Sequence, residues 1–350
     1  MRHDPAPVPL PSQLGRGSRA RYVLAAVAAL AALVSAGCST GGSPGGSVST
    51  TVTIAAVPGI DTAPIYLAQK TGLFAAAGLT HVVITNYSSE PAELAALQSG
   101  HVDIAASDYG DIFYSQSQSP DLRLLADGYD ASQGVLEVLT LPGSAITSPV
   151  DLAGQRVGVP NDQVLSGLTS SGNPISLDAA AATQVLSNYL GNNAESVTWV
   201  PMSQPQEITA LEQHQLPAVL VSEPYIYQAE SQLGAIAVLD ACSGSTASLP
   251  LSGYVAMKVW VKDNPAAVAD FQAAIGEAQT QASMTGQVQQ LLPKTTGMSA
   301  EDADLSTIGT YPTSTSAVGL ERVVRLMSNF NMIKSGEAPS VPPMIVKPGS

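Results

Sequence analysis

Short apolar runs alternate with amphipathic stretches through residues 51–111, and this pattern predicts strands that alternate with helices. The runs at 52–57, 81–85 and 102–106 have the length and the β-branched content of buried strands. The stretches between them carry apolar residues at helical spacing and are bounded by Pro, Ser and Gly, as helices commonly are. Such alternation builds a parallel sheet whose loops gather at the carboxyl ends of the strands, where ligands of open α/β sheets bind.

The same alternation continues to the C-terminal third of the chain, and no internal repeat is visible. The strands predicted there lie at 122–127, 134–141, 156–160, 197–200, 218–221, 236–239 and 254–261. The helices predicted there lie at 176–190, 206–214, 225–233, 265–282, 287–292 and 316–329. The pattern therefore predicts a large α/β protein.

The first 50 residues have the pattern of an export signal. A basic stretch that ends at Arg21 precedes an apolar run at 22–35, which is too short to span a bilayer comfortably. Small residues come directly before Cys38, and this arrangement resembles a bacterial lipobox, in which the cysteine is lipidated. We expect a lipoprotein signal peptide at 1–37 and a Gly/Ser tether at 38–50. The alternative is a plain cleaved signal with an incidental cysteine.

The charge and the cysteine count exclude several classes of function. The chain has 350 residues and a net charge of −14, and residues 1–37 hold four of its 14 basic and one of its 28 acidic residues, which leaves −17. An acidic surface disfavours nucleic acid and anionic lipid. With Cys38 lipidated, Cys242 is the remaining cysteine, so the sequence predicts no disulfide framework. We expect Cys242 to be a small buried residue or a mildly exposed thiol, and not a nucleophile. The sequence has no Cys/His metal spacing and no G-x-S-x-G, H-E-x-x-H or phosphate-loop motif, so we expect no metal, no cofactor and no catalytic residues.

Four segments carry a family resemblance. They are APIYLAQKTGLFAAAGL at 63–79, ELAALQSGHVDIAASD at 93–108, DLAGQRVGVP at 151–160 and SEP at 222–224. As a set, they resemble the substrate-binding lipoproteins of ABC importers, in particular the nitrate/sulfonate/taurine and thiamine-pyrimidine-precursor group. The resemblance spans about residues 51–260.

The resemblance implies a periplasmic-binding-protein type II fold, in which each of two lobes is a mixed, mostly parallel sheet flanked by helices. It implies two crossing segments that act as a hinge between the lobes. The domains expected on this basis are 51–145 for the first part of lobe one, 146–243 for lobe two, 244–334 for the return to lobe one, and 335–350 for an extended tail.

The implied function is capture of a small molecule in the cleft between the lobes and its delivery to an ABC permease with its ATPase. Such a protein is extracytoplasmic and is expected to be a monomer, anchored by lipid alone to the outer face of the bacterial cell membrane. Two alternatives stay open. One is a ligand-sensing module for a membrane sensor, and the other, less favoured, is an enzyme on the same fold.

The loops that the resemblance places at the cleft contain acidic and tyrosine side chains and no Lys or Arg. Carboxylates beside aromatic faces favour a neutral or cationic nitrogen heterocycle, such as an aminopyrimidine thiamine precursor, or a small amine. Nearby carboxylates would oppose an anion, although helix N-termini alone can bind one. The candidate ligand-binding residues are Pro58, Gly59, Asp61, Tyr87, Ser88, Ser107, Asp108, Tyr109, Tyr129, Asp130, Ser166, Glu223, Pro224 and Tyr225.

Two of the candidates also have a structural interpretation. Asp61 and Asp108 stand where helix N-caps are expected, so a capping role is the alternative to ligand contact for both. Four other aromatic residues fall on apolar faces or in strands, and we expect core positions for them: Tyr66, Tyr189, Trp199 and Trp260.

Overall fold

The computed structural model describes residues 51–160, 176–334 and 336–349, all of which belong to one compact unit that spans residues 48–350. The signal peptide, the tether, Cys38 and Ser166 lie outside the described residues, so the expectations about them stay predictions. Within the described ranges, no helix combines the length and the apolar composition that a bilayer crossing needs.

The first sheet defines lobe one and has the strand order β2-β1-β3-β10-β4. Strands β1, β2 and β3 are parallel, and β10 runs antiparallel to both of its neighbours. The strands span Val52–Ala56 (β1), Val82–Asn86 (β2), Ile104–Asp108 (β3), Leu122–Asp130 (β4) and Pro250–Met257 (β10).

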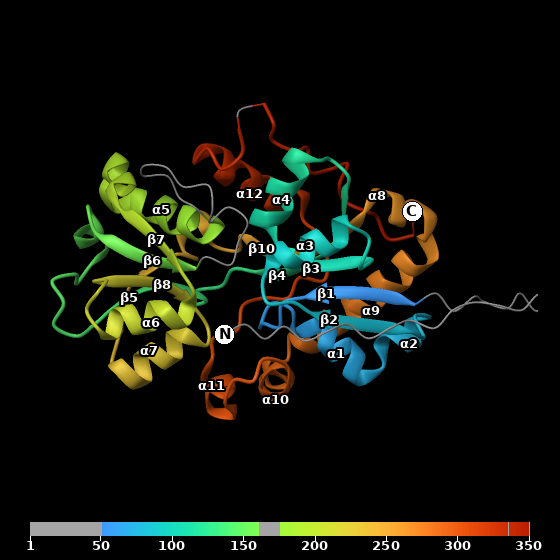
Figure 1. The fold of residues 1–350 in the computed structure, drawn as a ribbon, viewed down its shortest axis with the longest axis horizontal. Coiled ribbons are helices and arrows are strands. Elements are labelled where there is room, and N and C mark those ends of the chain that lie inside the picture. The colour runs from blue at the N-terminus through green and yellow to red at the C-terminus, as the bar shows by residue number, and fades with distance from the viewer. Residues whose placement is uncertain (1–50, 161–175, 335, 350) are drawn as a thin grey trace, which may run out of the picture. The chain divides into compact units, whose positions relative to one another are not determined.

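The second sheet defines lobe two and has the same arrangement, with the order β7-β6-β8-β5-β9. Strands β6, β7 and β8 are parallel, and β5 is antiparallel to β8 and β9. Figure 1 shows this sheet in green and yellow, apart from the blue and cyan strands of lobe one. The strands span Leu136–Thr140 (β5), Arg156–Pro160 (β6), Thr198–Met202 (β7), Ala218–Ser222 (β8) and Ile236–Asp240 (β9). The predicted fold class is therefore confirmed.

The chain crosses between the sheets twice, through residues 131–135 and 241–249. The first crossing corrects the expected boundary of lobe one at residue 145, because β5 pairs with β8 and β9 and so belongs to lobe two. An apolar strand looks alike in either sheet, and only its pairing partners decide which one it joins. The remaining domain limits stay predictions.

Helices cover both faces of each sheet. Those of lobe one are α1 (Ala63–Thr71), α2 (Leu73–Ala77), α3 (Glu90–Gln98), α4 (Tyr109–Gln118), α8 (Lys258–Asp263), α9 (Pro265–Ala282), α10 (Thr285–Thr295), α11 (Ala300–Leu305) and α12 (Ala317–Asn329). Those of lobe two are η1 (Pro149–Leu152), α5 (Leu177–Leu190), η3 (Gly191–Ser196), α6 (Gln204–Glu212) and α7 (Tyr225–Leu233), and η4 (Gly244–Thr246) lies in the second crossing.

Local sequence explains where helix α1 begins and ends. Pro64 stands in the first turn, where its missing N–H costs nothing because no partner within the helix exists for it there. Gly72 follows the last turn with φ of +76°, and its N–H donates to the carbonyls of Ala68 and Gln69. A residue that closes a helix in the left-handed backbone conformation is usually glycine, since a Cβ is unfavourable in that conformation.

Three clusters of buried side chains fill the layers between sheets and helices. The largest runs under α3, α4 and α12 in lobe one, through both crossings, and under α5 in lobe two. A second lies in lobe one between its sheet and helices α1, α9 and α10. A third and smaller one lies in lobe two beneath α6 and α7. Successive strand residues alternate between clusters, as Val219 and Leu220 do in β8, because neighbouring side chains point to opposite faces.

Four aromatic residues were expected at core positions, and the structure does not bury all of them. Trp199 is buried, and its Nε1–H donates to Thr183 Oγ1 at 3.2 Å. Tyr66 is buried as expected, whereas Tyr189 is 56% exposed near the end of α5, so its predicted core position is wrong. Trp260 is half-buried against the lobe-one core, but it lies on helix α8 because the predicted strand at 254–261 ends at Met257.

The predicted C-terminal tail packs against lobe one. Val341 and Met344 are buried. The N–H of Leu124 in β4 donates to Met344 O at 2.8 Å, and Val346 N–H donates back to Leu124 O at 2.9 Å. The tail is thus held at the edge of the first sheet by backbone hydrogen bonds and by apolar burial.

Candidate functional site

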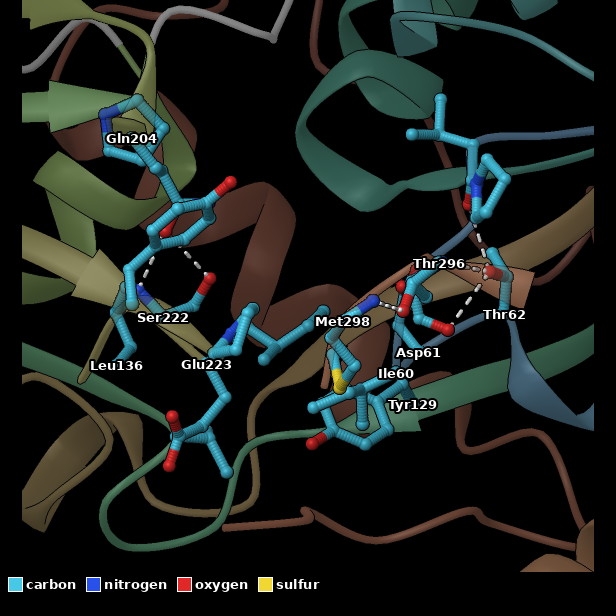
Figure 2. Close-up of a pocket in the computed structure, with 18 of the residues that line it drawn as sticks. Ile60, Asp61, Thr62, Tyr129, Leu136, Gln204, Ser222, Glu223, Thr296 and Met298 are labelled. Carbon is cyan, nitrogen blue, oxygen red and sulfur yellow. Dashed lines mark hydrogen bonds between the residues drawn. The ribbon is translucent and has the colours of Figure 1, made fainter. Parts of the chain in front are cut away.

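A cavity of about 700 Å³ is lined by residues from both lobes. Figure 2 shows Gln204, Ser222 and Glu223 of lobe two on one side and Asp61 and Thr62 of lobe one on the other. Most of the lining comes from strand ends and helix starts, as expected for an α/β ligand site. The segments that contribute include 57–62 after β1, Ala106 and Asp108 in β3, Val135 and Leu136 at the start of β5, 204–205 at the start of α6, 222–225 from the end of β8 to the start of α7, and 296–298 between α10 and α11.

The charged side chains in this lining are all acidic. Five carboxylates line the cavity: Asp61, Glu90, Asp108, Asp178 and Glu223. None of the described lining residues is Lys, Arg or His. Two like charges 4 Å apart repel by about 4 kcal/mol at an effective dielectric constant near 20. The lining is therefore suited to a cation or to a neutral molecule that donates hydrogen bonds, and it is unfavourable for an anion.

The loop after β1 is held by one threonine. Thr62 Oγ1 accepts the N–H of Gly59 at 2.9 Å and donates to Val57 O at 2.8 Å. Tyr311 donates its hydroxyl to Ile60 O at 2.6 Å, which ties the loop to the C-terminal part of lobe one. These bonds satisfy backbone groups of a tight turn and hold its backbone at the edge of the cavity.

Glu223 connects lobe two to lobe one at the cavity wall. One carboxylate oxygen, Oε2, accepts the N–H of Tyr227 at 3.0 Å, and the other, Oε1, accepts the N–H of Thr307 at 2.9 Å. Burial raises the pKa of this carboxyl, and the two N–H donors partly oppose that rise. Further contacts nearby join α7 to α11, including Gln228 Nε2, which donates to Asp302 at 3.5 Å. Glu223 thus lies where the two lobes meet and lines the cavity at the same time.

The structure brings eight of the predicted ligand-binding residues into the lining of this cavity. These are Pro58, Gly59, Asp61, Asp108, Tyr129, Glu223, Pro224 and Tyr225. The capping alternative comes out differently for the two aspartates. Asp61 precedes the N-cap of α1, which is Thr62. Asp108 is the N-cap residue of α4, as expected, but its side chain makes no cap hydrogen bond.

Five other predicted site residues lie outside the lining: Tyr87, Ser88, Ser107, Tyr109 and Asp130. Tyr109 is fully buried, stacks on Phe113 with ring centroids 5.4 Å apart, and donates its hydroxyl to Asp127. Ser107 is also fully buried, and its hydroxyl faces Glu93 in the interior of lobe one. A ligand in the cavity cannot reach either side chain, because each points from β3 or α4 into the packed layer.

The remaining three lie at the edges of lobe one. Ser88 is exposed, and Tyr87 packs partly buried against the core. Asp130 ends β4, where its backbone pairs with Thr310. Burial, together with the negative charge of Asp127, raises the pKa of the Asp130 carboxyl to about 7, and Arg322 opposes this rise.

Several lining residues were not singled out from the sequence. Glu90 and Asp178 stand in the first turns of α3 and α5, where an acidic residue is already expected from helix electrostatics. Gln204 begins helix α6 of lobe two, and an amide side chain gave no separate signal in the sequence. Thr296 and Met298 come from the turn after α10, and only the tertiary fold brings that turn to the cavity.

The described residues contain no group of three His, Cys, Asp or Glu side chains that could hold a metal ion. Cys242 is buried, and burial raises the pKa of its thiol above the ordinary value. A nucleophilic cysteine needs a lowered pKa and access to substrate, so Cys242 has the properties of a core residue.

Two lobes with the same strand order, two crossings and a cavity lined by both lobes define the two-lobed class of α/β binding folds. The chain belongs to the NMT1/THI5-like family, which it matches over residues 60–284. This confirms the resemblance noted in the sequence. No curated protein matches the chain.

Solved structures show the same fold at low sequence identity. The periplasmic aliphatic sulphonate binding protein SsuA from Escherichia coli is 18% identical, with a TM-score of 0.66 over 85% of this chain and 92% of its own. The periplasmic nitrate-binding protein NrtA from Synechocystis PCC 6803 is 15% identical, with a TM-score of 0.61 over 85% of this chain and 86% of its own. The desulfurization enzyme DSZB is 16% identical, with a TM-score of 0.57 over 83% of this chain and 94% of its own.

Proposed function

We propose that this chain is the extracytoplasmic solute-binding component of an ABC importer, and that it delivers a small nitrogen heterocycle, neutral or cationic, to a membrane permease with its ATPase. The family and the fold of the binding-protein neighbours support the solute-binding part. The observation that carries the ligand class is the acidic lining of the cavity, with five carboxylates and no basic side chain among its described residues.

The acidic lining argues against the anions that the structural neighbours are named for. A sulfonate or nitrate in this cavity would lose its hydration and lie near carboxylates with no basic side chain of the described lining to offset them. An amino group on a heterocycle can instead donate hydrogen bonds to carboxylates, and Tyr129 and Tyr225 supply aromatic surface in the same lining. An aminopyrimidine of the thiamine-precursor type meets both requirements.

The proposal includes no catalytic step. The DSZB neighbour makes an enzyme on this fold the natural competing function. The buried thiol of Cys242 argues against a cysteine nucleophile in this chain, since its raised pKa keeps it protonated. The cavity lining offers carboxylates that suit recognition of a ligand without any chemistry on it.

A lipid anchor on Cys38 is the second part of the proposal, and it rests on the small residues before that cysteine and on the Gly/Ser composition of residues 39–50. The anchor would hold the monomer to the outer face of the cell membrane. Replacement of Cys38 by alanine is expected to abolish lipid labelling and to release the protein or leave it unprocessed. Lipid labelling that persists in the variant would contradict the anchor and would leave the solute-binding proposal unaffected.

A thermal-shift screen of residues 48–350 tests the proposed ligand class. The panel contains aminopyrimidines, flavins, polyamines, taurine, alkanesulfonates and nitrate. A ligand that binds the native state alone raises its stability by about 2.7 kcal/mol at a hundred times its dissociation constant. We expect a shift with an aminopyrimidine or an amine. A shift with sulfonate or nitrate alone would contradict the ligand class while keeping the solute-binding role.

A further inference from the structure

The two lobes share a nine-residue sequence pattern that becomes visible once their strands are matched. Residues 89–97 read SEPAELAAL, and residues 203–211 read SQPQEITAL. Ser, Pro, Glu, Ala and Leu recur at the same places. The first pattern opens α3 after β2, and the second opens α6 after β7, and these two strands hold the same edge position in their sheets. The expectation that the chain has no internal repeat is therefore corrected.

The two copies fold alike in detail. Their shared glutamates, Glu93 and Glu207, are both completely buried. Both helices are followed by a residue in the left-handed region, Gly100 with φ of +74° and His214 with φ of +55°. His214 adopts this conformation without being a glycine, so the geometry of the repeat is kept where the residue type does not favour it. The two segments are thus equivalent in structure as well as in sequence.

The second position of the pattern places one side chain from each lobe at the cavity. In lobe one it is Glu90, whose Oε2 accepts the N–H of Asp108 at 3.2 Å. In lobe two it is Gln204, whose Oε1 accepts the N–H of Ser222 at 3.0 Å. Both bonds join residues 18 apart, and both N–H donors belong to the residue that ends the central strand of the sheet in their lobe. The side chain at this position is charged in lobe one and neutral in lobe two.

The charge on Glu90 is not needed for this structural role. Gln204 accepts the equivalent backbone N–H with a neutral amide of the same shape. The charge on Glu90 lies in a lining that already holds Asp61 and Asp108, where further negative charge is unfavourable. The N-terminus of a helix favours a carboxylate at either position, yet α6 has none there. The two lobes therefore present equivalent side chains of different charge to the same cavity.

We propose that Glu90 and Gln204 are a matched pair of specificity-determining residues that contact the ligand from opposite lobes. The carboxylate of Glu90 faces the positively charged or hydrogen-bond-donating end of the ligand, and the amide of Gln204 faces a neutral polar part of it. This assignment rests on the proposed solute-binding function and names the residue that sets its charge preference.

The test uses two probes of almost identical shape. At neutral pH, 4-aminopyridine is a cation and 4-aminopyrimidine is neutral. Calorimetric titration of both into the wild type, Glu90→Gln, Gln204→Glu and the double exchange gives four pairs of dissociation constants. Glu195→Gln is the matched control, because it removes the same charge from an exposed residue outside the lining.

We expect Glu90→Gln to weaken 4-aminopyridine about tenfold, through loss of one nearby charge, and to change 4-aminopyrimidine by less than about twofold. Its melting temperature should match that of the wild type, because glutamine still accepts the N–H of Asp108. The double exchange, which moves the charge to lobe two, should recover most of the lost affinity for the cation. The control should bind both probes as the wild type does.

Unchanged binding of 4-aminopyridine by Glu90→Gln would overturn the assignment while leaving the proposed function in place. So would an equal loss in the Glu195→Gln control, because the effect would then come from net charge. A wild type that binds neither probe, or that binds only a sulfonate, would overturn the proposed ligand class and this assignment together. The two failures are therefore distinguishable.

Discussion

Lobe one and lobe two have the same strand order, but they differ in how much of the chain packs around each sheet. In lobe one, the face away from the largest core is covered by α1, α9 and α10 over a broad cluster of buried side chains. In lobe two, the corresponding face is covered by α6 and α7 over a much smaller cluster. The difference arises because the chain returns to lobe one after β9 and adds its C-terminal helices there.

This comparison predicts different roles for the two lobes, although they share one arrangement of strands. Buried apolar area is the main stabilising term in folding, so lobe one is expected to be the more stable half. Local stability follows packing, and elements with few buried contacts open more easily. Lobe two supplies Gln204, Ser222 and Glu223 to the cavity from the less heavily packed half. We therefore expect lobe one to act as the scaffold and lobe two as the half that adjusts to a ligand.

The largest expected effect compares one substitution at two equivalent positions of the repeat. Leu97 is fully buried in the largest core, and Leu211 is 1% exposed in the small cluster of lobe two. Leu97→Ala should lower the free energy of unfolding by about 4 kcal/mol and Leu211→Ala by about 2 kcal/mol, because a cavity near a small cluster collapses more easily. Urea denaturation of both variants measures the difference. Equal losses, or a larger loss for Leu211→Ala, would contradict the comparison.

The second-largest effect is a loss of stability on substitution of Asp127, which links the C-terminal part of the chain to the sheet of lobe one. Asp127 in β4 is buried and accepts the hydroxyl of Tyr109 and the N–H of Ser316, the latter at 3.1 Å. Asp127→Ala leaves both donors without an acceptor and should cost about 3 kcal/mol of unfolding free energy. Asp127→Asn keeps one acceptor oxygen and should cost less. Equal costs for the two variants would show that the carboxylate is not what holds these segments together.

The smallest effect is a pH dependence of stability, to which buried carboxyls of both lobes contribute. Burial raises the pKa of Glu137 in lobe two and of Asp130 in lobe one to about 7, assisted by Glu230 at the first and by Asp127 at the second. The folded state then binds more protons than the unfolded state between about pH 4 and pH 7, so stability is full below this window and falls as pH rises through it. Thermal melts across this range should show a falling melting temperature.

Glu137→Gln separates the contributions of the two lobes to this dependence. The variant removes the lobe-two carboxyl, so its melting temperature should fall less steeply with pH than that of the wild type. A melting temperature that rises with pH in the wild type would contradict the assigned direction of both pKa shifts.

The fold was predictable from the sequence because its signals are local and repeated. Apolar runs of strand length, helix-ending glycines and the family segments together give both sheets and most helices. What the pattern could not give was the lobe to which β5 belongs, since a run such as Leu136–Thr140 pairs equally well in either sheet. The end of β10 was also missed, because Trp260 continues an apolar run into a helix.

The candidate site was predictable only where a residue follows a strand directly. Asp61, Asp108 and Glu223 were found because each stands at or after the carboxyl end of a strand, at the edge where loops gather. Tyr109 was placed at the cleft for the same reason and is instead buried, since the direction of a side chain depends on the helix that follows. Glu90 was not predicted as a site residue, because an acidic residue in the first turn of a helix is common. Its equivalence to Gln204 became visible only when the two lobes were compared.

The most direct test of the central claim is a calorimetric titration of the wild-type protein with 4-aminopyridine and, side by side, with methanesulfonate. An acidic cavity without a basic side chain among its described lining residues should bind the cation and show no heat of binding for the sulfonate. Binding of methanesulfonate in preference to the cation would contradict the account, because helix N-termini would then outweigh the five carboxylates of the lining.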